Sequence, residues 1–375
     1  MVTGIVSLGP LFHDDARPAT PERPTVPFAV SLLALGNVPG LGTHGLRALA
    51  DELGGDLPRL WQMSQPQIEG LLARVRVRGA ERIARDITER FPILVSRAER
   101  QLDDLSRRGV EIIAPAELPS TLREIPDAPQ WLFFQGDRQV LYHRPVVAVV
   151  GTRKPSPTGR RVAAFVAKML AAYPIVLVSG LAEGIDEEAH RASLQEGVRN
   201  LAFLGHGIDV VFPSSTAWIR DHIVEEGGGV ATEYLPREHY RASYFVQRNR
   251  LQAALADLVI PIETRQEGGT AHTIRFARRY RRRILALRWK GASGVVERLA
   301  GEDFRTIDIV SDPPGWKELD RILQALAEEH GHQTSSLSLV ERRLRCDLMA
   351  RNVRPGELER LMRILADFAT SQGDA

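Results

Sequence analysis

The feature that most constrains the fold lies between residues 146 and 186, where two short apolar runs alternate with helical patterns. The first run, Val147–Val150, is followed by Gly-Thr-Arg, and the second, Ile175–Val178, is followed by Ser-Gly. Apolar residues recur at helical spacing between them, and Gly184-Ile185-Asp186 leads into another helix. Fully apolar strands that alternate with helices are typical of a parallel sheet covered on both faces. The pattern therefore predicts an α/β fold whose strand ends can bind phosphate.

The same alternation extends on both sides of this unit. We expect further strands at residues 110–113, 131–134, 201–204, 230–232, 258–262, 283–287 and 306–310, most of them separated by helical patterns. Strands and helices at this spacing form a doubly wound sheet. The sequence therefore predicts an extended Rossmann-like domain over residues 110–312.

Three other regions surround this domain. Residues 1–27 contain five prolines and few apolar anchors, which predicts a disordered tail. Residues 28–109 read as an N-terminal helical domain, in which a Pro-Gly-Leu-Gly turn at 39–42 separates two helices. This outline fits either a helix-hairpin-helix (SAM-like) motif that offers amides to a nucleic-acid phosphate or an ordinary turn in a helical bundle. Residues 313–375 are expected to form a helical C-terminal region that ends in a short tail.

Composition narrows the class of protein. The 375 residues include no apolar run long enough for a membrane span, and residues 1–27 lack the pattern of a secretory signal. Cys346 is the sole cysteine, so an intrachain disulfide and a cysteine-based zinc cluster are excluded, and a cytoplasmic protein without membrane contact is predicted. The net charge is only +2, yet all but four of the 49 basic residues are arginines. Arginine suits bidentate phosphate contacts, although genomic composition bias explains the excess more simply.

The loops after the predicted strands collect small and polar residues. Each glycine taken singly is better explained by turn geometry, but several strand ends of the same kind favour a crevice that binds phosphate. None has Walker or dinucleotide spacing, so no cofactor is predicted. The candidate phosphate-binding residues in these loops are Gly151, Thr152, Arg153, Ser179, Gly180, Gly184, Asp186, Gly205, Gly207, Glu233, Gly268, Gly269 and Thr270. His190, on the helix that follows Asp186, is a further candidate.

Two basic segments add to these candidates. Arg248 and Arg250 flank Asn249 at what reads as the start of a helix, and residues two apart on a helix point roughly 200° apart. We therefore expect one arginine to face the crevice and the other to be exposed. A later helix carries basic residues interleaved with Phe276 and Tyr280, which suits single-stranded DNA, although such runs are usually solvated faces. Its candidate DNA contacts are Arg275, Arg278 and Arg279.

Evidence for catalysis is weak. His190 follows Asp186 by four residues, which permits an acid/base pair on one helical face. A helix-capping role for Asp186, with His190 packed nearby, explains the pair equally well. No group of residues has metal-ligand spacing. Neither a catalytic residue nor a metal site is predicted.

Five motifs in order resemble the DNA-processing protein A (DprA, also called Smf) family. They are VAVVGTR at 147–153, VSGLAEGID at 178–186, LGHGIDVVFP at 204–213, TEY at 232–234 and FVQRNR at 245–250. The resemblance identifies a divergent member and implies an extended Rossmann-like fold with single-stranded DNA bound beside the GTR and RNR motifs. It also implies a homodimer and a non-enzymatic role, in which the protein protects single-stranded DNA and assists loading of a RecA-type recombinase in DNA uptake and recombination.

The sequence departs from the family pattern in places. Residues 267–270 and 288–291 replace its usual loops, and no winged-helix domain is recognisable in residues 335–375. A different DNA pathway, including phage defence, therefore stays open. The alternative hypothesis is a Rossmann-like nucleotide sensor or nucleoside-monophosphate hydrolase that uses Glu263 and the loop Gly268-Gly269-Thr270. The catalytic glutamate that usually follows that loop has no counterpart here.

Overall fold

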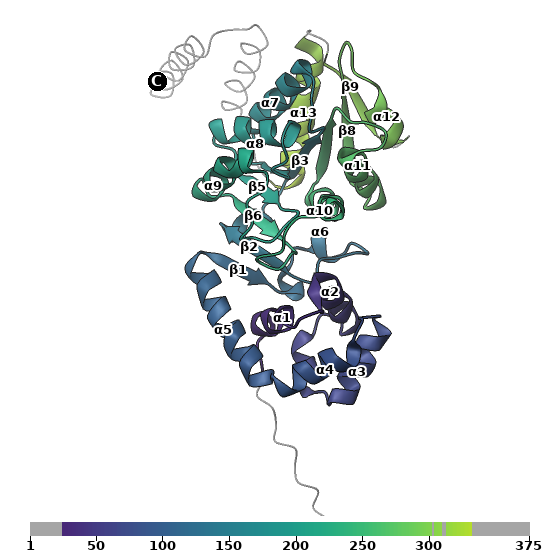
Figure 1. The fold of residues 1–375 in the computed structure, drawn as a ribbon. Coiled ribbons are helices and arrows are strands. Elements are labelled where there is room, and N and C mark those ends of the chain that lie inside the picture. The colour runs from purple at the N-terminus through teal and green to yellow at the C-terminus, as the bar shows by residue number, and fades with distance from the viewer. Residues whose placement is uncertain (1–24, 302–303, 310–312, 332–375) are drawn as a thin grey trace, which may run out of the picture.

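The computed structural model describes residues 25–331 except 302–303 and 310–312 (Figure 1). The predicted N-terminal tail and the end of the C-terminal region, residues 332–375, lie outside the described residues. No helix in the part of the chain that the structure describes is both long and apolar enough to cross a membrane.

The N-terminal helices pack as a bundle at one end of the molecule (Figure 1). The central helix α1 is apolar on nearly every side and is buried from Val30 to Leu35. A capping box starts α3, in which the Ser64 amide donates to the Gln67 side chain over 2.8 Å. The helices are α1 (Phe28–Gly36), α2 (Gly42–Glu52), α3 (Gln65–Arg74), α4 (Ala80–Glu89) and α5 (Phe91–Arg107), with a 3-10 helix at Leu57–Gln62.

A nine-stranded sheet follows, in the spatial order β1-β2-β6-β5-β4-β3-β7-β8-β9. The seven strands from β6 to β9 in that order run parallel, whereas β1 and β2 pair antiparallel at one edge. The prediction of an extended Rossmann-like doubly wound sheet is therefore confirmed. The strands are β1 (Val110–Ile113), β2 (Leu132–Gly136), β3 (Val146–Gly151), β4 (Val176–Ser179), β5 (Asn200–Phe203), β6 (Gly229–Thr232), β7 (Leu258–Ile262), β8 (Arg283–Arg288) and β9 (Arg305–Asp308).

Helices cover both faces of this sheet. Alternate residues of β3 enter different cores: Val147 and Val149 pack with α7, α8 and α13, whereas Val146 and Val150 pack with α10, α11 and α12. This is why β3 reads as an unbroken apolar run. The helices of the sheet region are α6 (Ser120–Arg123), α7 (Pro157–Leu170), α8 (Ile185–Gln195), α9 (Ala217–Glu225), α10 (Ala242–Leu255), α11 (Gly269–Arg279), α12 (Val295–Ala300) and α13 (Pro313–Glu329).

The helical bundle and the sheet share apolar contacts. One buried cluster joins Leu33 and Leu46 of the bundle with Phe133, Leu204 and Val230 of the sheet region. The division of the chain at residues 109 and 110, between α5 and β1, stays our proposal for the domain boundary.

Candidate phosphate-binding pocket at the switch point

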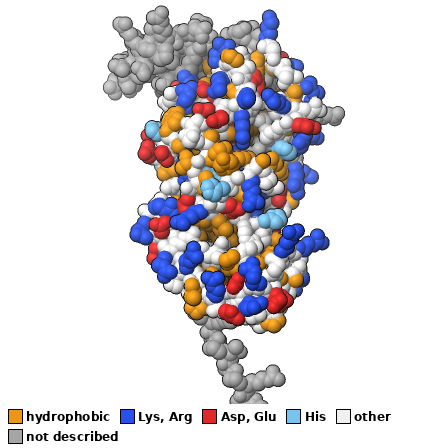
Figure 2. Space-filling model, in the orientation of Figure 1, with side chains coloured by type: hydrophobic (Ala, Val, Ile, Leu, Met, Phe, Trp, Pro, Cys, Tyr) orange, Lys and Arg blue, Asp and Glu red, His pale blue; other side chains and the backbone are white. Residues whose placement is uncertain are grey.

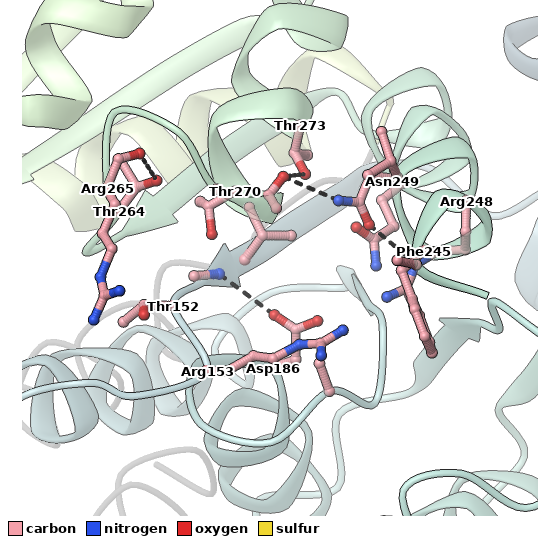
Figure 3. Close-up of a pocket in the computed structure, with 18 of the residues that line it drawn as sticks. Thr152, Arg153, Asp186, Phe245, Arg248, Asn249, Thr264, Arg265, Thr270 and Thr273 are labelled. Carbon is pink, nitrogen blue, oxygen red and sulfur yellow. Dashed lines mark hydrogen bonds between the residues drawn. The ribbon is translucent and has the colours of Figure 1, made fainter. Parts of the chain in front are cut away.

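The strand order reverses between β3 and β7, because β4, β5 and β6 continue from β3 in one direction and β8 and β9 from β7 in the other. Ligands of open α/β sheets bind at such a switch point, outside the carboxyl ends of the strands. A pocket of about 660 Å³, here called the switch pocket, lies there and is shown in Figure 3. Its lining includes predicted residues Gly151, Thr152, Arg153, Asp186, Arg248, Asn249, Gly268, Gly269 and Thr270.

Three cations at the rim of the switch pocket form no salt bridge with another of the described residues. Arg153 and Lys154 follow β3, and Arg265 follows β7; all three are exposed. Arg153 lies over the Phe245 ring, with 5.0 Å between the guanidinium carbon and the ring centroid. An exposed cation without an ion pair is free to meet an incoming phosphate.

Of the helices that begin at this edge, α11 differs from α7 and α8 in its N-terminus. The Ser156 side chain caps α7, accepting from the Gly159 amide over 3.0 Å. The N-cap of α8 is Gly184, but the first amides of this helix donate to loop carbonyls, Ile185 to Thr152 over 3.2 Å and Glu187 to Ala182 over 3.0 Å. The N-cap of α11 is Gly268, which has no side chain to accept from the first amides of the helix. The positive end of the α11 dipole is therefore open to an anion in the switch pocket.

Aromatic rings line the opposite side of the switch pocket. Phe212 and Tyr240 stack with their ring centroids 3.7 Å apart, and Phe245 lies 5.8 Å from Phe212. Tyr240 is 44% exposed, so one ring of the cluster remains open to solvent. Figure 2 shows hydrophobic side chains gathered near the middle of the upper half of the molecule. Sequence reasoning missed these rings together with Lys154, Gln252 and Arg265, although Lys154 and Arg265 follow predicted strand ends and Phe245 lies one helical turn before Arg248.

Arg248 and Arg250 are both buried, so the expectation that one of them would be exposed is wrong. They lie in the interior of α10, not at its start, because the helix begins at Ala242. Arg248 donates to the carbonyl oxygens of Gly180 and Phe203 and to the Asn249 side chain. Three of its five donor hydrogens are thus used, which leaves at most two for a ligand. Burial lowers the pKa of Arg248 to about 10, so it stays charged at neutral pH.

Arg250 faces the N-terminal bundle instead of the pocket. Its two terminal nitrogens donate to the two Glu233 oxygens over 2.7 and 2.6 Å, and Arg47 of α2 pairs with the same carboxylate. Although burial alone would raise the pKa of Glu233, the two arginines hold it below its ordinary value. Glu233 and Arg250 therefore form a structural ion cluster beneath the pocket, and neither lines it.

The acid/base pair that the spacing of Asp186 and His190 permits does not form, and the alternative in which Asp186 caps its helix is wrong as well. Asp186 is the second residue of α8, whose N-cap is Gly184, and its carboxylate lies 3.4 Å from the Gly151 amide. His190 is fully buried and bonds to the Asn200 side chain over 2.8 Å, away from the lining of the switch pocket. Burial raises the pKa of Asp186, against the effect of Arg248, and lowers the pKa of His190 to about 4.

The remaining predicted loop residues have steric or bracing roles. A side chain at Gly184 would come within 2.6 Å of the Thr152 carbonyl oxygen, and one at Gly205 within 2.5 Å of the Phe245 ring. At Gly207 a side chain would meet the carbonyl oxygens of Leu235 and Pro236. The Ser179 hydroxyl donates a hydrogen bond to the Val149 carbonyl over 2.6 Å, and the Gly180 carbonyl accepts one from the Arg248 guanidinium.

The basic end of α11 is separate from the switch pocket. Arg275, Arg278 and Arg279 line another groove. Phe276 and Tyr280, expected to stack with bases, are partly buried against the core, and Tyr280 donates to Asp127 over 2.5 Å. Only the N-terminal half of α11 contributes to the switch pocket, because the helix axis carries the later turns away from the strand ends.

Glu263, the residue on which the hydrolase hypothesis depends, does not line the switch pocket. Its side chain accepts from the Ser156 amide over 2.7 Å and from the Ser156 hydroxyl, which holds it at the start of α7. Among the residues that the structure describes, no three His, Cys, Asp or Glu side chains gather as metal ligands.

Comparisons with known proteins agree with this architecture. Residues 110–299 match the profile of the family described as DNA recombination-mediator protein A. The chain is 38% identical to DNA processing protein DprA of Streptococcus pneumoniae over 169 residues, which are 45% of this chain and 59% of that protein. It is 33% identical to Protein Smf of Escherichia coli over 169 residues, 45% of each chain. The matched regions thus span about half the length of these curated relatives.

Solved structures give the same result for the fold. The crystal structure of DprA from Streptococcus pneumoniae superposes with a TM-score of 0.57 at 27% identity, over 74% of this chain and 94% of that one. DNA processing protein A from Helicobacter pylori, whose structure is described in terms of its single-stranded DNA binding mode, gives a TM-score of 0.52 at 24% identity over 59% of this chain and 99% of that chain. The profile match covers half of the sequence, and the chain belongs to the DNA recombination-mediator protein A (DprA/Smf) family.

Proposed function

We propose that this protein binds single-stranded DNA in the switch pocket and acts in DNA processing or recombination without catalysing a reaction. The observation that carries the proposal is the pairing, in one pocket, of unpaired cations and an uncapped helix N-terminus with a cluster of aromatic rings. The first group suits a phosphate, and the second suits a base. Membership in the DprA/Smf family supports the same conclusion.

The phosphate is expected at the α11 end of the pocket. The amides that follow Gly268 provide donors without a competing cap, and Arg153, Lys154 and Arg265 surround them with positive charge. Helix N-termini and arginine guanidinium groups both favour anions with two oxygens side by side, such as the non-bridging oxygens of a phosphodiester. Arg248 adds positive charge from below.

The aromatic cluster favours single strands over duplexes. The open face of Tyr240 beside Phe212 and Phe245 offers a platform for stacking, and a base can stack there only when it is released from its pair. Stacking accepts every base, so the binding is expected to depend little on sequence. Protection of single-stranded DNA, recombinase loading and a homodimer complete this proposal and follow from the family resemblance. A cytoplasmic location is proposed from the composition of the chain.

Fluorescence anisotropy with single-stranded DNA, duplex DNA and a mononucleotide at two salt concentrations tests the proposal. We expect single-stranded DNA to bind tightest and its affinity to fall as salt increases, because each neutralised phosphate releases counterions. Tight binding of the mononucleotide alone would instead support the nucleotide-sensor hypothesis. An affinity that does not change with salt concentration would contradict the proposed phosphate contacts.

A further inference from the structure

A second basic feature lies at the opposite end of α11 from the switch pocket. A groove of about 760 Å³, here called the arginine groove, is lined by Ile284, Ala300 and six arginines. In the orientation of Figure 2, Lys and Arg side chains occur along the right-hand edge of the upper half, where Figure 1 places α11 and α12. The six are Arg275, Arg278, Arg279, Arg281, Arg282 and Arg283.

Most of these arginines lack a carboxylate partner in the described part of the chain. Arg279 pairs with Asp127 at 3.4 Å and Arg283 with Glu329 at 2.8 Å. The other four form no salt bridge within the described residues: Arg275, Arg278 and Arg282 donate to backbone carbonyl oxygens, and Arg282 also lies in the field of Asp257 and Glu124. The buried Nε of Arg282 has no hydrogen-bond partner. A groove with this excess of positive charge attracts anions.

The conformation of Arg281 places it at the groove but does not by itself indicate a function. Arg281 has φ +55° and follows α11 in a Schellman motif, in which its amide and that of Arg282 bond back to Arg278 and Ala277. Glycine usually occupies this position because L residues are strained there. Arg76, with φ +58°, occupies the same position of the same motif after α3. What distinguishes Arg281 is the five arginines that surround it.

The arginine groove and the switch pocket are joined by α11 itself. Arg275, Arg278 and Arg279 are spaced to share one face of the helix. Arg275 also donates to the Gln266 carbonyl over 3.4 Å, and Gln266 lies between Arg265 and Glu267, which both line the switch pocket. A helix of 11 residues is about 16 Å long, so the cations form a continuous track between the two sites.

We infer that the arginine groove holds the phosphodiester backbone of the strand whose neighbouring nucleotides occupy the switch pocket, an inference that rests on the proposed function. The strand passes along α11, with Arg275 between the two sites. An acidic protein surface fits less well, because the only other residues lining the groove are Ile284 and Ala300, which are 4% and 2% exposed. Protein interfaces usually depend on an apolar or aromatic centre.

The test compares oligothymidylates of about 5 and about 30 nucleotides by anisotropy with the full chain. Arg281→Gly should weaken binding of the long oligonucleotide about fivefold and lower its salt dependence, and leave the short one unchanged. Its thermal midpoint should stay equal or rise, because glycine accommodates a positive φ. Arg278→Gln should weaken binding of the long oligonucleotide to a similar extent.

Arg76→Gly is the matched control, because it makes the same substitution at the same position of the same motif outside the groove. It should have a similar effect on the thermal midpoint and none on DNA affinity. The inference is overturned if the Arg281→Gly and Arg278→Gln variants bind the long oligonucleotide with wild-type affinity. It is also overturned if Arg76→Gly reduces the affinity for the long oligonucleotide equally, or if the groove variants also reduce the affinity for the short one. Failure of the wild-type protein to bind either length would instead overturn the proposed function, and the inference with it.

Discussion

Arginines at the rim of the switch pocket and arginines in the interior beneath it have opposite roles. Arg153 and Arg265 are exposed and form no salt bridge with the described residues, whereas Arg250 is 1% exposed and bonded twice to Glu233. We therefore propose that the same side chain binds ligands where it is exposed beside a helix N-terminus, whereas it braces the fold where a buried carboxylate neutralises it. A place in a recognisable sequence motif does not tell these two roles apart, because Arg153 and Arg250 both belong to one.

The largest effect is expected from breaking the interior cluster. Arg250→Ala leaves the Glu233 carboxylate buried with Arg47 alone, and removal of one partner of a buried ion pair costs about 3 to 5 kcal/mol of unfolding free energy. Urea unfolding measures this loss. Arg321→Ala, which breaks an exposed 3.3 Å pair on α13, is the control and should cost less than about 1 kcal/mol. Equal effects would show that Arg250 is not a brace.

A second interior effect is a dependence of stability on pH. Burial lowers the pKa of His190 from 6.5 to about 4, so the unfolded chain binds the proton more strongly than the folded chain. Stability from this group is present above pH 6.5 and is lost as pH falls toward 4, by about 3 kcal/mol in total. His190→Leu should flatten the curve of unfolding free energy against pH in this window. The buried His206, whose pKa is also lowered, should retain part of the slope; identical curves would contradict the assignment.

At the rim, the expected change is in binding and not in folding. Arg153→Ala should weaken single-stranded DNA binding roughly tenfold, which corresponds to about 1.4 kcal/mol, for every sequence alike. The slope of log affinity against log salt should fall by about 0.7. Unfolding free energy should change by less than about 0.5 kcal/mol, since Arg153 is exposed. A loss of stability without a loss of DNA affinity would show that Arg153 supports the fold, as Arg250 does, and does not bind DNA.

The smallest effect concerns the helix ends. Ser156→Ala removes the cap of α7 and one partner of Glu263, which should cost about 1 kcal/mol of stability. Because α7 is already capped and α11 is not, DNA affinity should not change. Weaker binding in this variant, measured by anisotropy under the same conditions, would place the phosphate at α7.

The strand ends could be found in the sequence because each depends on neighbouring residues. Val147 to Val150 form an apolar run that ends in glycine, and this local pattern predicted β3 and its turn. The roles of the residues after each turn depend on distant partners: Glu233 meets Arg47, which lies 186 residues away. No periodicity or spacing records that contact.

The doubly wound sheet, its strand ends and the family could therefore be predicted from the sequence alone, because unbroken apolar runs, the spacing of helices and strands, and the five ordered motifs are all local features of the chain. The tertiary structure was needed to show which arginines face solvent, that the N-terminus of α11 at the switch pocket has no side-chain cap, and that the basic end of α11 forms a separate groove. Those properties depend on the side chains that long-range packing brings beside each charge. A charge becomes a binding group or a structural one according to whether packing supplies it with a partner.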